Sequence, residues 1–219
     1  MYSQTEENYL KLLHVLANPK GEVSISELSN SLNVSLPTVN SMVRNLKSQG
    51  LVNYEKYRPI SLTEKGKKEG AAVIRKHRLT EMFLVTRMGF GWEEVHDIAE
   101  QIEHIQSSAL FERMDQLLGF PQIDPHGSPI PDKDGEIIIV SQTKLSICKS
   151  GEKAKVIAVA QSSTDFLNFL NSRKLKLGTI LEILSVESFD GSMTVCYIDH
   201  PTVVLSHFVC EGLFVEQLN

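Results

Sequence analysis

The sequence predicts an α+β protein in which helices come first and a small β domain comes last. Three observations support this class. Apolar residues recur at helical spacing through most of residues 5–118, β-type runs fill much of residues 178–208, and a segment rich in Pro and Gly lies between them. A chain of 219 residues with 42% hydrophobic and 22% charged residues is ordinary for a globular protein of more than one domain. We place the domains at residues 1–63, 64–140 and 141–219.

The first domain has three helical patterns followed by two strand patterns. TEENYLKLLHVLAN predicts a first helix, and SISELSNSL predicts a short second one with a capping box of Ser24 and Glu27. LPTVNSMVRNLKSQG predicts a third helix with Ser35 as its cap and Pro37 in its first turn. LVNYEKYRPISLT then predicts two short strands joined by a basic turn. This order of elements predicts a winged helix-turn-helix.

The exposed side of the predicted third helix suits contact with DNA. Short polar side chains near its start can approach base edges, and a cation further along can pair with a phosphate. Residues 36–80 carry ten Lys and Arg against three Asp and Glu, a net charge of +7 that favours phosphates. Residues 81–140 carry three against twelve, a net charge of −9 that favours cations. The residues expected to face DNA are Ser35, Pro37, Thr38, Asn40, Ser41, Arg44 and Arg58.

The middle domain is predicted to hold three helices with more apolar surface than one small domain needs. Thr63 can cap the long pattern TEKGKKEGAAVIRKHRLTEMFLVTRM, and WEEVHDIAEQIEHIQSS and ALFERMDQLLG predict two more helices. FPQIDPHGSPIPDKDGEI then predicts an ordered loop and a linker. We expect the surplus apolar face to form a homodimer interface. Its residues are Leu79, Phe83, Leu84, Ile98, Ile102, Leu110 and Leu117.

In the last domain the sequence pattern changes from helical to β-type. GTILEILSV, SMTVCYI and TVVLSHF are predicted strands, and Asp190-Gly191 is a hairpin signal between the first two. STDFLNFLNSR predicts one helical insert near the start of the domain. Together these patterns predict a small antiparallel β-barrel.

Histidines and acids gather at helical spacing in VHDIAEQIEH. His96, Glu100, Glu103 and His104 fall within an arc of about 100° on one helix face. Carboxylates stacked in this way repel one another unless a positive charge lies among them, so the face is either solvated or half of a metal site. Carboxylate, amide and imidazole ligands together suit Mn²⁺ or Fe²⁺, with Zn²⁺ as a further option. Further donors are His77 and Glu81 on the preceding helix, Asp124 and His126 in IDPHG, and Asn8 beside Glu6 and Glu7.

Several of these motifs together resemble the diphtheria-toxin-repressor family of metal-dependent transcriptional regulators. The likeness extends over essentially the whole chain and rests on LPTV with QGLV after it, RKHRLTE, EVHDIAEQIEH and PHGSPIP. The last domain resembles the SH3-like, FeoA-type domain of the three-domain members. The resemblance implies a repressor of manganese or iron homeostasis that binds palindromic operator DNA as a homodimer, with two metal sites per subunit as the switch.

The resemblance implies a first metal site made of Glu100, Glu103, His104 and one residue of the first helix, Asn8. Iron-responsive members have soft donors at the positions of Asn8 and Glu100, whereas manganese-responsive members have Asp and Glu there. Glu100 is therefore of the manganese type, while Asn8 keeps an oxygen but loses a charge. Lys11 stands where two-domain manganese regulators carry a Glu ligand, so their paired-metal arrangement is not expected here.

The resemblance leaves two forms open for the second site. Some members use a His-Glu-His set, whereas three-domain manganese-responsive members use a Glu, a Cys and a His of the loop, and an Asp of the SH3-like domain. We favour the latter form, in which Asp124 replaces the Cys. This oxygen ligand makes the site harder and further favours Mn²⁺ over softer metals. The first form consists of His77, Glu81 and His96, and the second of Glu81, Asp124, His126 and Asp165.

Other functions agree less well with the sequence. A metal-dependent hydrolase needs a general base and a substrate cleft, yet no HExxH, nucleophile motif or Gly-rich phosphate loop occurs, so no enzyme activity is expected. The alternative that stays open is a winged-helix regulator that metal does not gate. The three cysteines form no CxxC pair, the N-terminus is unlike a secretory signal, and no apolar run is long enough to span a membrane. We therefore expect a cytoplasmic protein without a membrane partner.

Overall fold

The computed structural model describes residues 2–137 and 142–218, which divide into two compact units. The first unit comprises residues up to 80, residues 98–122 and the segment that starts at residue 130. The second comprises residues 81–97, residues 123–129 and the C-terminal part of the chain. The predicted three-domain division stays a prediction, and its boundary between residues 140 and 141 lies outside the described residues.

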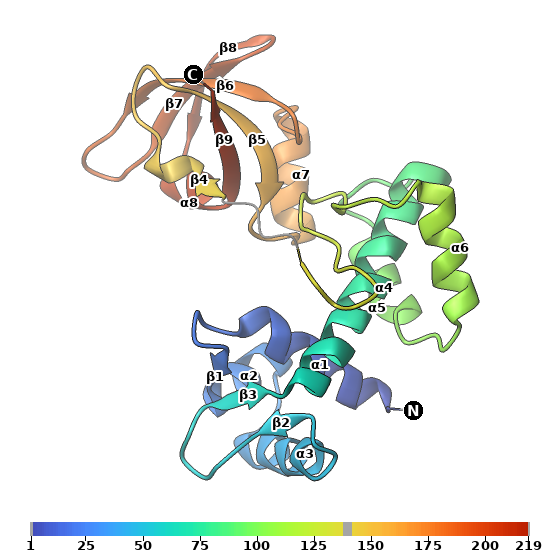
Figure 1. Ribbon diagram of the computed structural model, residues 1–219. Coiled ribbons are helices and arrows are strands. Elements are labelled where there is room, and N and C mark those ends of the chain that lie inside the picture. Colours follow the sequence, from blue (N-terminus) through green and yellow to red (C-terminus); the bar gives the residue numbers. More distant parts are fainter. Residues whose placement is uncertain (1, 138–141, 219) are drawn as a thin grey trace. The chain divides into compact units, whose positions relative to one another are not determined.

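The N-terminal part of the first unit is the predicted winged helix-turn-helix (Figure 1). The capping box at the start of its second helix is formed as expected, because the Ser24 Oγ accepts a hydrogen bond from the Glu27 N–H at 3.1 Å and the Ser24 N–H donates to the Glu27 carboxylate at 2.7 Å. Strand β3 lies between β1 and β2 in an antiparallel sheet. The elements are α1 (Gln4–Leu16), β1 (Glu22–Val23), α2 (Ile25–Leu32), α3 (Leu36–Ser48), β2 (Val52–Asn53) and β3 (Ile60–Leu62).

A hydrophobic core holds the winged helix together and fixes which side of α3 faces solvent. Val39, Val43 and Leu46 are fully buried on the inner side of α3, and they pack with Leu10 and Leu13 of α1. Since these positions recur at helical spacing, the polar residues between them are left at the surface. The side of α3 that the sequence assigns to DNA is therefore the side that the fold exposes.

Three helices follow the wing: α4 (Glu64–Met88), α5 (His96–Ile102) and α6 (Ser108–Leu118). Thr63 caps α4 as predicted, with its Oγ1 accepting a hydrogen bond from the Gly66 N–H at 3.1 Å. The prediction for α5 was too long at both ends. A turn in which the Gly91 N–H donates to Glu94 Oε2 at 2.7 Å precedes the helix, and the Ile105 N–H donates to the Ile102 carbonyl at its end.

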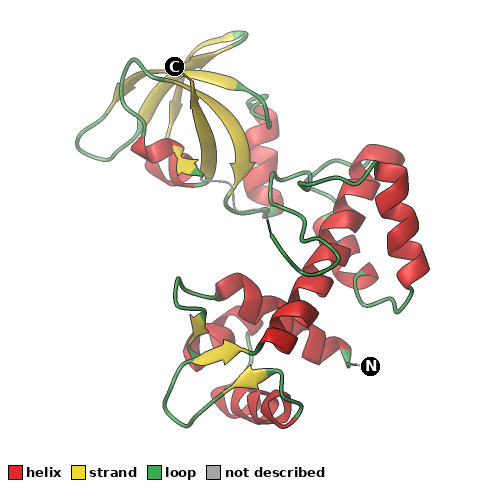
Figure 2. Ribbon diagram, in the orientation of Figure 1, coloured by secondary structure: helices red, strands yellow, loops and turns green. Residues whose placement is uncertain are grey.

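The C-terminal part of the second unit contains a six-stranded antiparallel sheet in the order β4-β9-β5-β6-β7-β8. Its strands are drawn in yellow in Figure 2. The hairpin at Asp190-Gly191 is confirmed, with Gly191 at a positive φ of 69°. The strand predicted through residue 208 ends at Leu205, because Ser206 caps a short helix there. The elements are β4 (Thr143–Lys144), the 3₁₀ turn η1 (Leu145–Ile147), β5 (Lys153–Val159), α7 (Thr164–Ser172), β6 (Ile180–Val186), β7 (Met193–Tyr197), β8 (His200–Leu205), α8 (His207–Glu211) and β9 (Leu213–Leu218).

The sheet domain has its own core, which includes one face of the sheet and the inner side of the helical insert α7. Phe166, Leu167 and Leu170 of α7 are buried against the strands. Its antiparallel sheet agrees with the predicted SH3-like domain, whereas closure of the sheet into a barrel stays a prediction. In the part of the chain that the structure describes, no helix is both long and apolar enough to cross a bilayer.

Candidate metal centre and DNA-binding surface

Glu81, Asp124 and His126 converge inside the second unit. All three side chains are buried, and one potential ligand atom from each lies within 4.8 Å of the others. Glu81 comes from α4, whereas Asp124 and His126 come from the loop after α6. Two carboxylates buried this close together repel unless a cation or a proton lies among them, so the cluster has the composition of a metal-binding site.

The His126 ring is oriented with Nδ1 toward the cluster. Its Nε2 donates a hydrogen bond to the Trp92 carbonyl at 2.9 Å, which leaves Nδ1 3.6 Å from Glu81 Oε2. A metal-binding histidine is commonly held by such a hydrogen bond from its other ring nitrogen. Burial by itself lowers the pKa of His126, but the interaction with Glu81 and the negative charges of Glu81 and Asp124 outweigh it, so the pKa is raised. The cluster therefore attracts positive charge.

A tight turn fixes Asp124. Its Oδ1 accepts hydrogen bonds from the backbone N–H groups of His126 at 2.8 Å and Ser128 at 2.9 Å. Asp132 repeats this turn eight residues later, accepting from the N–H groups of Asp134 and Glu136 at 2.8 and 2.9 Å, but it lies at the surface. The turn alone therefore does not make the site, because burial beside Glu81 and His126 distinguishes Asp124 from Asp132.

The sheet domain holds the His126 loop in place. The His126 carbonyl accepts a hydrogen bond from the Val159 N–H at 2.9 Å, at the end of β5. The backbone of Gly127 approaches the strand so closely that an added Cβ would lie 2.2 Å from the Ile157 carbonyl oxygen, and its φ is 86°. The His126 ring also stacks on Trp92, with 5.9 Å between centroids. Hence the C-terminal domain positions the cluster through backbone contacts.

The three other predicted ligands of the second site do not belong to the buried cluster of Glu81, Asp124 and His126. Asp165 is exposed in the first turn of α7 and is not a member of the Glu81 cluster. His96 is largely exposed, with its Nδ1 3.5 Å from Glu81 Oε1. His77 belongs to the first unit and Glu81 and His96 to the second, so the His-Glu-His form stays a prediction from the sequence. In the form that we favour, the structure brings together three of the four predicted ligands: Glu81, Asp124 and His126.

A second group of acids and histidines joins α1 to α5 within the first unit. His104 Nδ1 donates a hydrogen bond to the buried Glu7 carboxylate at 2.6 Å, and its Nε2 lies 3.6 Å from Glu103 Oε1. Glu103 is fully buried, and the Lys11 ammonium lies 2.7 Å from Glu103 and 2.5 Å from Glu100. The predicted ligands Glu100, Glu103 and His104 are thus brought together. Glu7 and Lys11 were not predicted to take part in this site, although helical spacing puts them on one face of α1.

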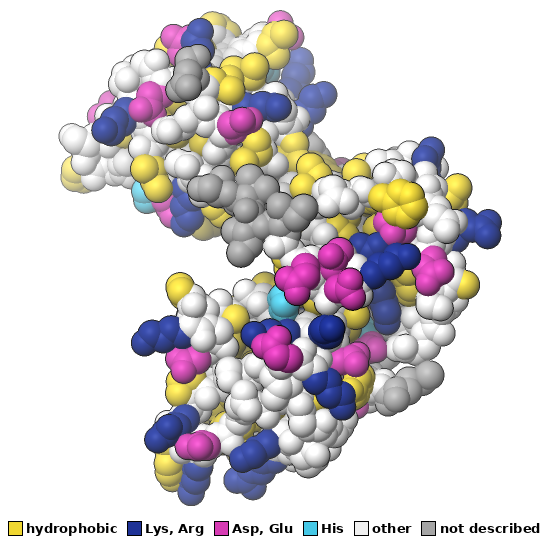
Figure 3. Space-filling model, in the orientation of Figure 1, with side chains coloured by type: hydrophobic (Ala, Val, Ile, Leu, Met, Phe, Trp, Pro, Cys, Tyr) yellow, Lys and Arg dark blue, Asp and Glu magenta, His cyan; other side chains and the backbone are white. Residues whose placement is uncertain are grey.

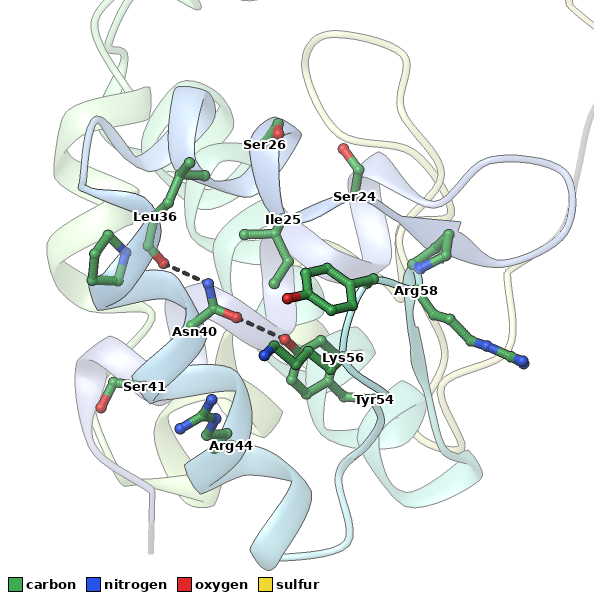
Figure 4. A pocket seen from close by; sticks show the side chains of 13 residues that line it. Ser24, Ile25, Ser26, Leu36, Asn40, Ser41, Arg44, Tyr54, Lys56 and Arg58 are labelled. Carbon is green, nitrogen blue, oxygen red and sulfur yellow. Dashed lines mark hydrogen bonds between the residues drawn. The ribbon is translucent and has the colours of Figure 1, made fainter.

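An open groove of about 760 Å³ lies between α3 and the wing (Figure 4), and it is lined by five of the seven predicted DNA-facing residues: Pro37, Asn40, Ser41, Arg44 and Arg58. Arg44 and Ser41 are exposed on α3. In the wing, Tyr57 is 90% exposed, the Lys56 ammonium lies over its ring, and Arg58 forms an exposed ion pair with Glu55. Lys and Arg side chains are spread over this part of the molecule on the face that Figure 3 shows. The groove therefore offers cations and aromatic surface to a polyanion.

The remaining predicted contacts differ in how accessible their polar groups are. Thr38 is exposed, and its Oγ1 lies 2.8 Å from the Oγ of the helix cap Ser35; Pro37 is also exposed. Asn40 is already engaged, because its Nδ2 donates to the Leu36 carbonyl at 3.0 Å and its Oδ1 accepts from the Tyr54 hydroxyl at 2.7 Å (Figure 4). Asn40 therefore links the helix to the wing.

Comparison with known proteins explains why a candidate metal site and a DNA-binding surface occur in one chain. Residues 1–60 match the model of the iron dependent repressor N-terminal DNA binding domain, and residues 63–132 match that of the iron dependent repressor metal binding and dimerisation domain. The HTH-type transcriptional regulator MntR of Geobacillus thermodenitrificans is 33% identical over 124 residues, which are 57% of this chain and 87% of that protein. The chain belongs to the iron-dependent repressor family. This is a family of metal-dependent transcriptional repressors, as the resemblance predicted.

Other members of the iron-dependent repressor family match different shares of the chain. The iron-dependent repressor IdeR of Mycobacterium tuberculosis is 37% identical over 127 residues, which are 58% of this chain and only 55% of that protein. A solved structure described as a manganese-dependent transcriptional repressor in complex with manganese is 34% identical, with a TM-score of 0.88 over 97% of this chain and 100% of that one. The repressor ScaR with bound Zn²⁺ is 31% identical, with a TM-score of 0.80 over 97% of this chain and 99% of that one.

Proposed function

We propose that this iron-dependent repressor family member is a Mn²⁺-responsive repressor that binds operator DNA as a homodimer, with Fe²⁺ as the alternative effector. The observation that carries the proposal is the buried cluster of Glu81, Asp124 and His126, which offers oxygen and nitrogen ligands and no sulfur. Mn²⁺ and Fe²⁺ prefer such ligands, whereas thiolates favour softer metals. The similar structure that contains manganese supports the same choice.

The cluster is also well placed to influence the DNA-binding surface through the chain itself. Glu81 lies on α4, and the residue before this helix, Thr63, is hydrogen-bonded to the winged helix through Leu51 at 3.0 Å and Gly50 at 2.8 Å. A bound divalent cation supplies the positive charge that allows Glu81 and Asp124 to remain ionised side by side. Glu81, Asp124 and His126 would then hold α4 and the loop in one arrangement. Restricting the chain in this way favours a state that is competent to bind DNA.

A homodimer accounts for apolar surface that one chain leaves incompletely buried. Leu117 of α6 is 50% exposed, and Phe83, Ile102 and Leu110 are only partly buried. Leu79 and Leu84 are already buried within one chain, so they contribute to the intrachain core. Two copies related by a twofold axis would present two α3 helices to the two halves of a palindromic operator.

Operator binding measured by fluorescence anisotropy tests this function. DNA from the region upstream of the gene is titrated at fixed salt with Mn²⁺, with Fe²⁺ under anaerobic conditions, with Zn²⁺, or with EDTA. We expect Mn²⁺ or Fe²⁺ to tighten binding about tenfold or more, which is within the usual range of allosteric coupling. Equal binding with each metal and with EDTA would support a winged-helix regulator that metal does not gate.

A further inference from the structure

We propose that the Lys11 ammonium is a built-in competitor of the metal ion for Glu100 and Glu103, so that this second site fills only at higher metal concentration than the Glu81 cluster. The inference rests on the proposed metal-dependent function and adds a difference between its two sites. It follows from contacts within the first unit that join α1 of the winged helix to α5.

Lys11 has the position and charge of a cation shared by two carboxylates. Its ammonium is 2.5 Å from Glu100 Oε1 and 2.7 Å from Glu103 Oε1, and its side chain is only 16% exposed. Charged hydrogen bonds of this length are stronger than neutral ones. Water screens the contact with Glu103 little, because Glu103 is fully buried, and the contact with Glu100 more, because the Glu100 side chain is 36% exposed. The ammonium therefore supplies part of the positive charge that these two carboxylates require.

Glu103 shows the competition most clearly, because protein donors already bind both of its oxygens. Lys11 donates to Oε1, and His77 Nδ1 donates to Oε2 at 2.6 Å. Each oxygen keeps a second lone pair, but a metal ion bound there would lie beside the Lys11 ammonium, which is 2.7 Å from Oε1, and the two cations would repel unless the ammonium moved away. Lys11 has a long, flexible side chain that is 16% exposed, whereas the His77 ring is attached to α4 by a short side chain and is 11% exposed, so the ammonium is the donor that yields more easily.

Asn8, one turn before Lys11 on α1, supports the idea that a metal ion can still enter. Its Oδ1 is buried and has no hydrogen-bond partner in the structure. A buried carbonyl oxygen without a donor is costly, and a cation is one of the groups that satisfies it. Asn8 is the residue of α1 that the resemblance assigns to this site, so its unpartnered oxygen would leave the site a ligand for metal while Lys11 competes, which predicts weak rather than absent metal binding.

The test measures Mn²⁺ binding to full-length protein in which Asp124→Asn has weakened the Glu81 cluster. Free Mn²⁺ is followed by electron paramagnetic resonance in three proteins: this background, the background with Lys11→Met, and the background with Lys20→Met. Lys20 is exposed on the same domain, so its variant controls for the lost charge. We expect Lys11→Met to tighten Mn²⁺ binding about tenfold or more, equal to about 1.4 kcal/mol, and Lys20→Met to leave it unchanged.

A second readout separates competition from a purely structural role of Lys11. Without metal, Lys11→Met should lower the melting temperature because it leaves Glu100 and Glu103 without their cation, and saturating Mn²⁺ should raise it more than in the wild-type protein. Unchanged or weaker Mn²⁺ binding in Lys11→Met would overturn the proposal, and Lys11→Gln must change the affinity in the same direction. The wild-type protein is titrated in parallel. If the proposed function fails instead, Asp124→Asn will bind Mn²⁺ with the same affinity as the wild-type protein.

Discussion

Replacing Asp124 by Asn should weaken Mn²⁺ binding without disturbing the loop that carries it. The amide oxygen of Asn can still accept the hydrogen bonds from the N–H groups of His126 and Ser128 that Asp124 Oδ1 accepts now. What is removed is one negative charge from a buried cluster whose ligand atoms lie within 4.8 Å of one another. The variant therefore isolates the electrostatic part of metal binding.

The expected size of this effect follows from the geometry of the cluster. Two unit charges about 4 Å apart attract by about 4 kcal/mol at an effective dielectric constant near 20, and the attraction is larger for a divalent ion. Part of this gain is offset because the metal ion must give up water to enter the buried cluster. We expect a net loss of about 2–3 kcal/mol, which corresponds to roughly 30- to 150-fold weaker binding.

Calorimetric titration of the metal-free protein with Mn²⁺ measures this loss. Asp132→Asn is the matched control, because Asp132 forms the same turn with the N–H groups of Asp134 and Glu136 but lies at the surface. We expect wild-type affinity in Asp132→Asn. If both variants bound Mn²⁺ as tightly as the wild-type protein does, Asp124 would not be a ligand and the electrostatic reasoning would be refuted.

Three further predictions follow from individual residues. Arg44→Ala should weaken binding to all DNA sequences about equally and reduce the slope of log affinity against log salt by about 1, because an exposed cation on α3 pairs with a phosphate; binding at several salt concentrations checks this. Burial raises the pKa of the Cys210 thiol to about 12, so near neutral pH Cys196 should react with a thiol reagent and Cys210 should not, as peptide mapping would reveal. Burial and two nearby cations lower the pKa of His14, so the folded protein loses stability as the pH falls below about 6.5, the ordinary value at which the unfolded chain takes up the proton. His14→Gln should reduce that loss in melting temperature, and an unchanged pH profile would show that His14 does not contribute.

Local signals in the sequence were sufficient for most of the fold. The capping box at Ser24, the cap at Thr63 and the hairpin at Asp190-Gly191 depend on neighbours within a few residues, and all three form as predicted. Strands β5 and β9 were not predicted, since they are defined by pairing with each other across more than fifty residues. The shortened α5 has a similar explanation, because the Trp92 indole donates to Asn171 at 2.8 Å and holds the segment before α5 on the sheet domain.

The candidate metal centre was predictable in composition but not in arrangement. The resemblance supplied Glu81, Asp124 and His126 together with Asp165, yet the exposure of Asp165 at the start of α7 depends on how the sheet domain packs. Lys11 was visible in the sequence as a departure from related proteins. Its position between Glu100 of α5 and Glu103, which directly follows α5, becomes apparent only when α1 and this segment are brought together. The fold brings together charged residues that are distant in the sequence, and local sequence patterns do not predict such contacts.

The most direct test of metal gating is the affinity for Mn²⁺ measured with and without bound operator DNA. Because coupling between two sites is reciprocal, operator DNA must tighten Mn²⁺ binding by the same factor by which Mn²⁺ tightens operator binding. We predict a factor of roughly 5 to 150, equal in the two directions, and close to 1 with DNA that lacks the operator. An affinity for Mn²⁺ that operator DNA leaves unchanged would show that the metal site and the DNA-binding surface are not coupled, which contradicts the proposed function.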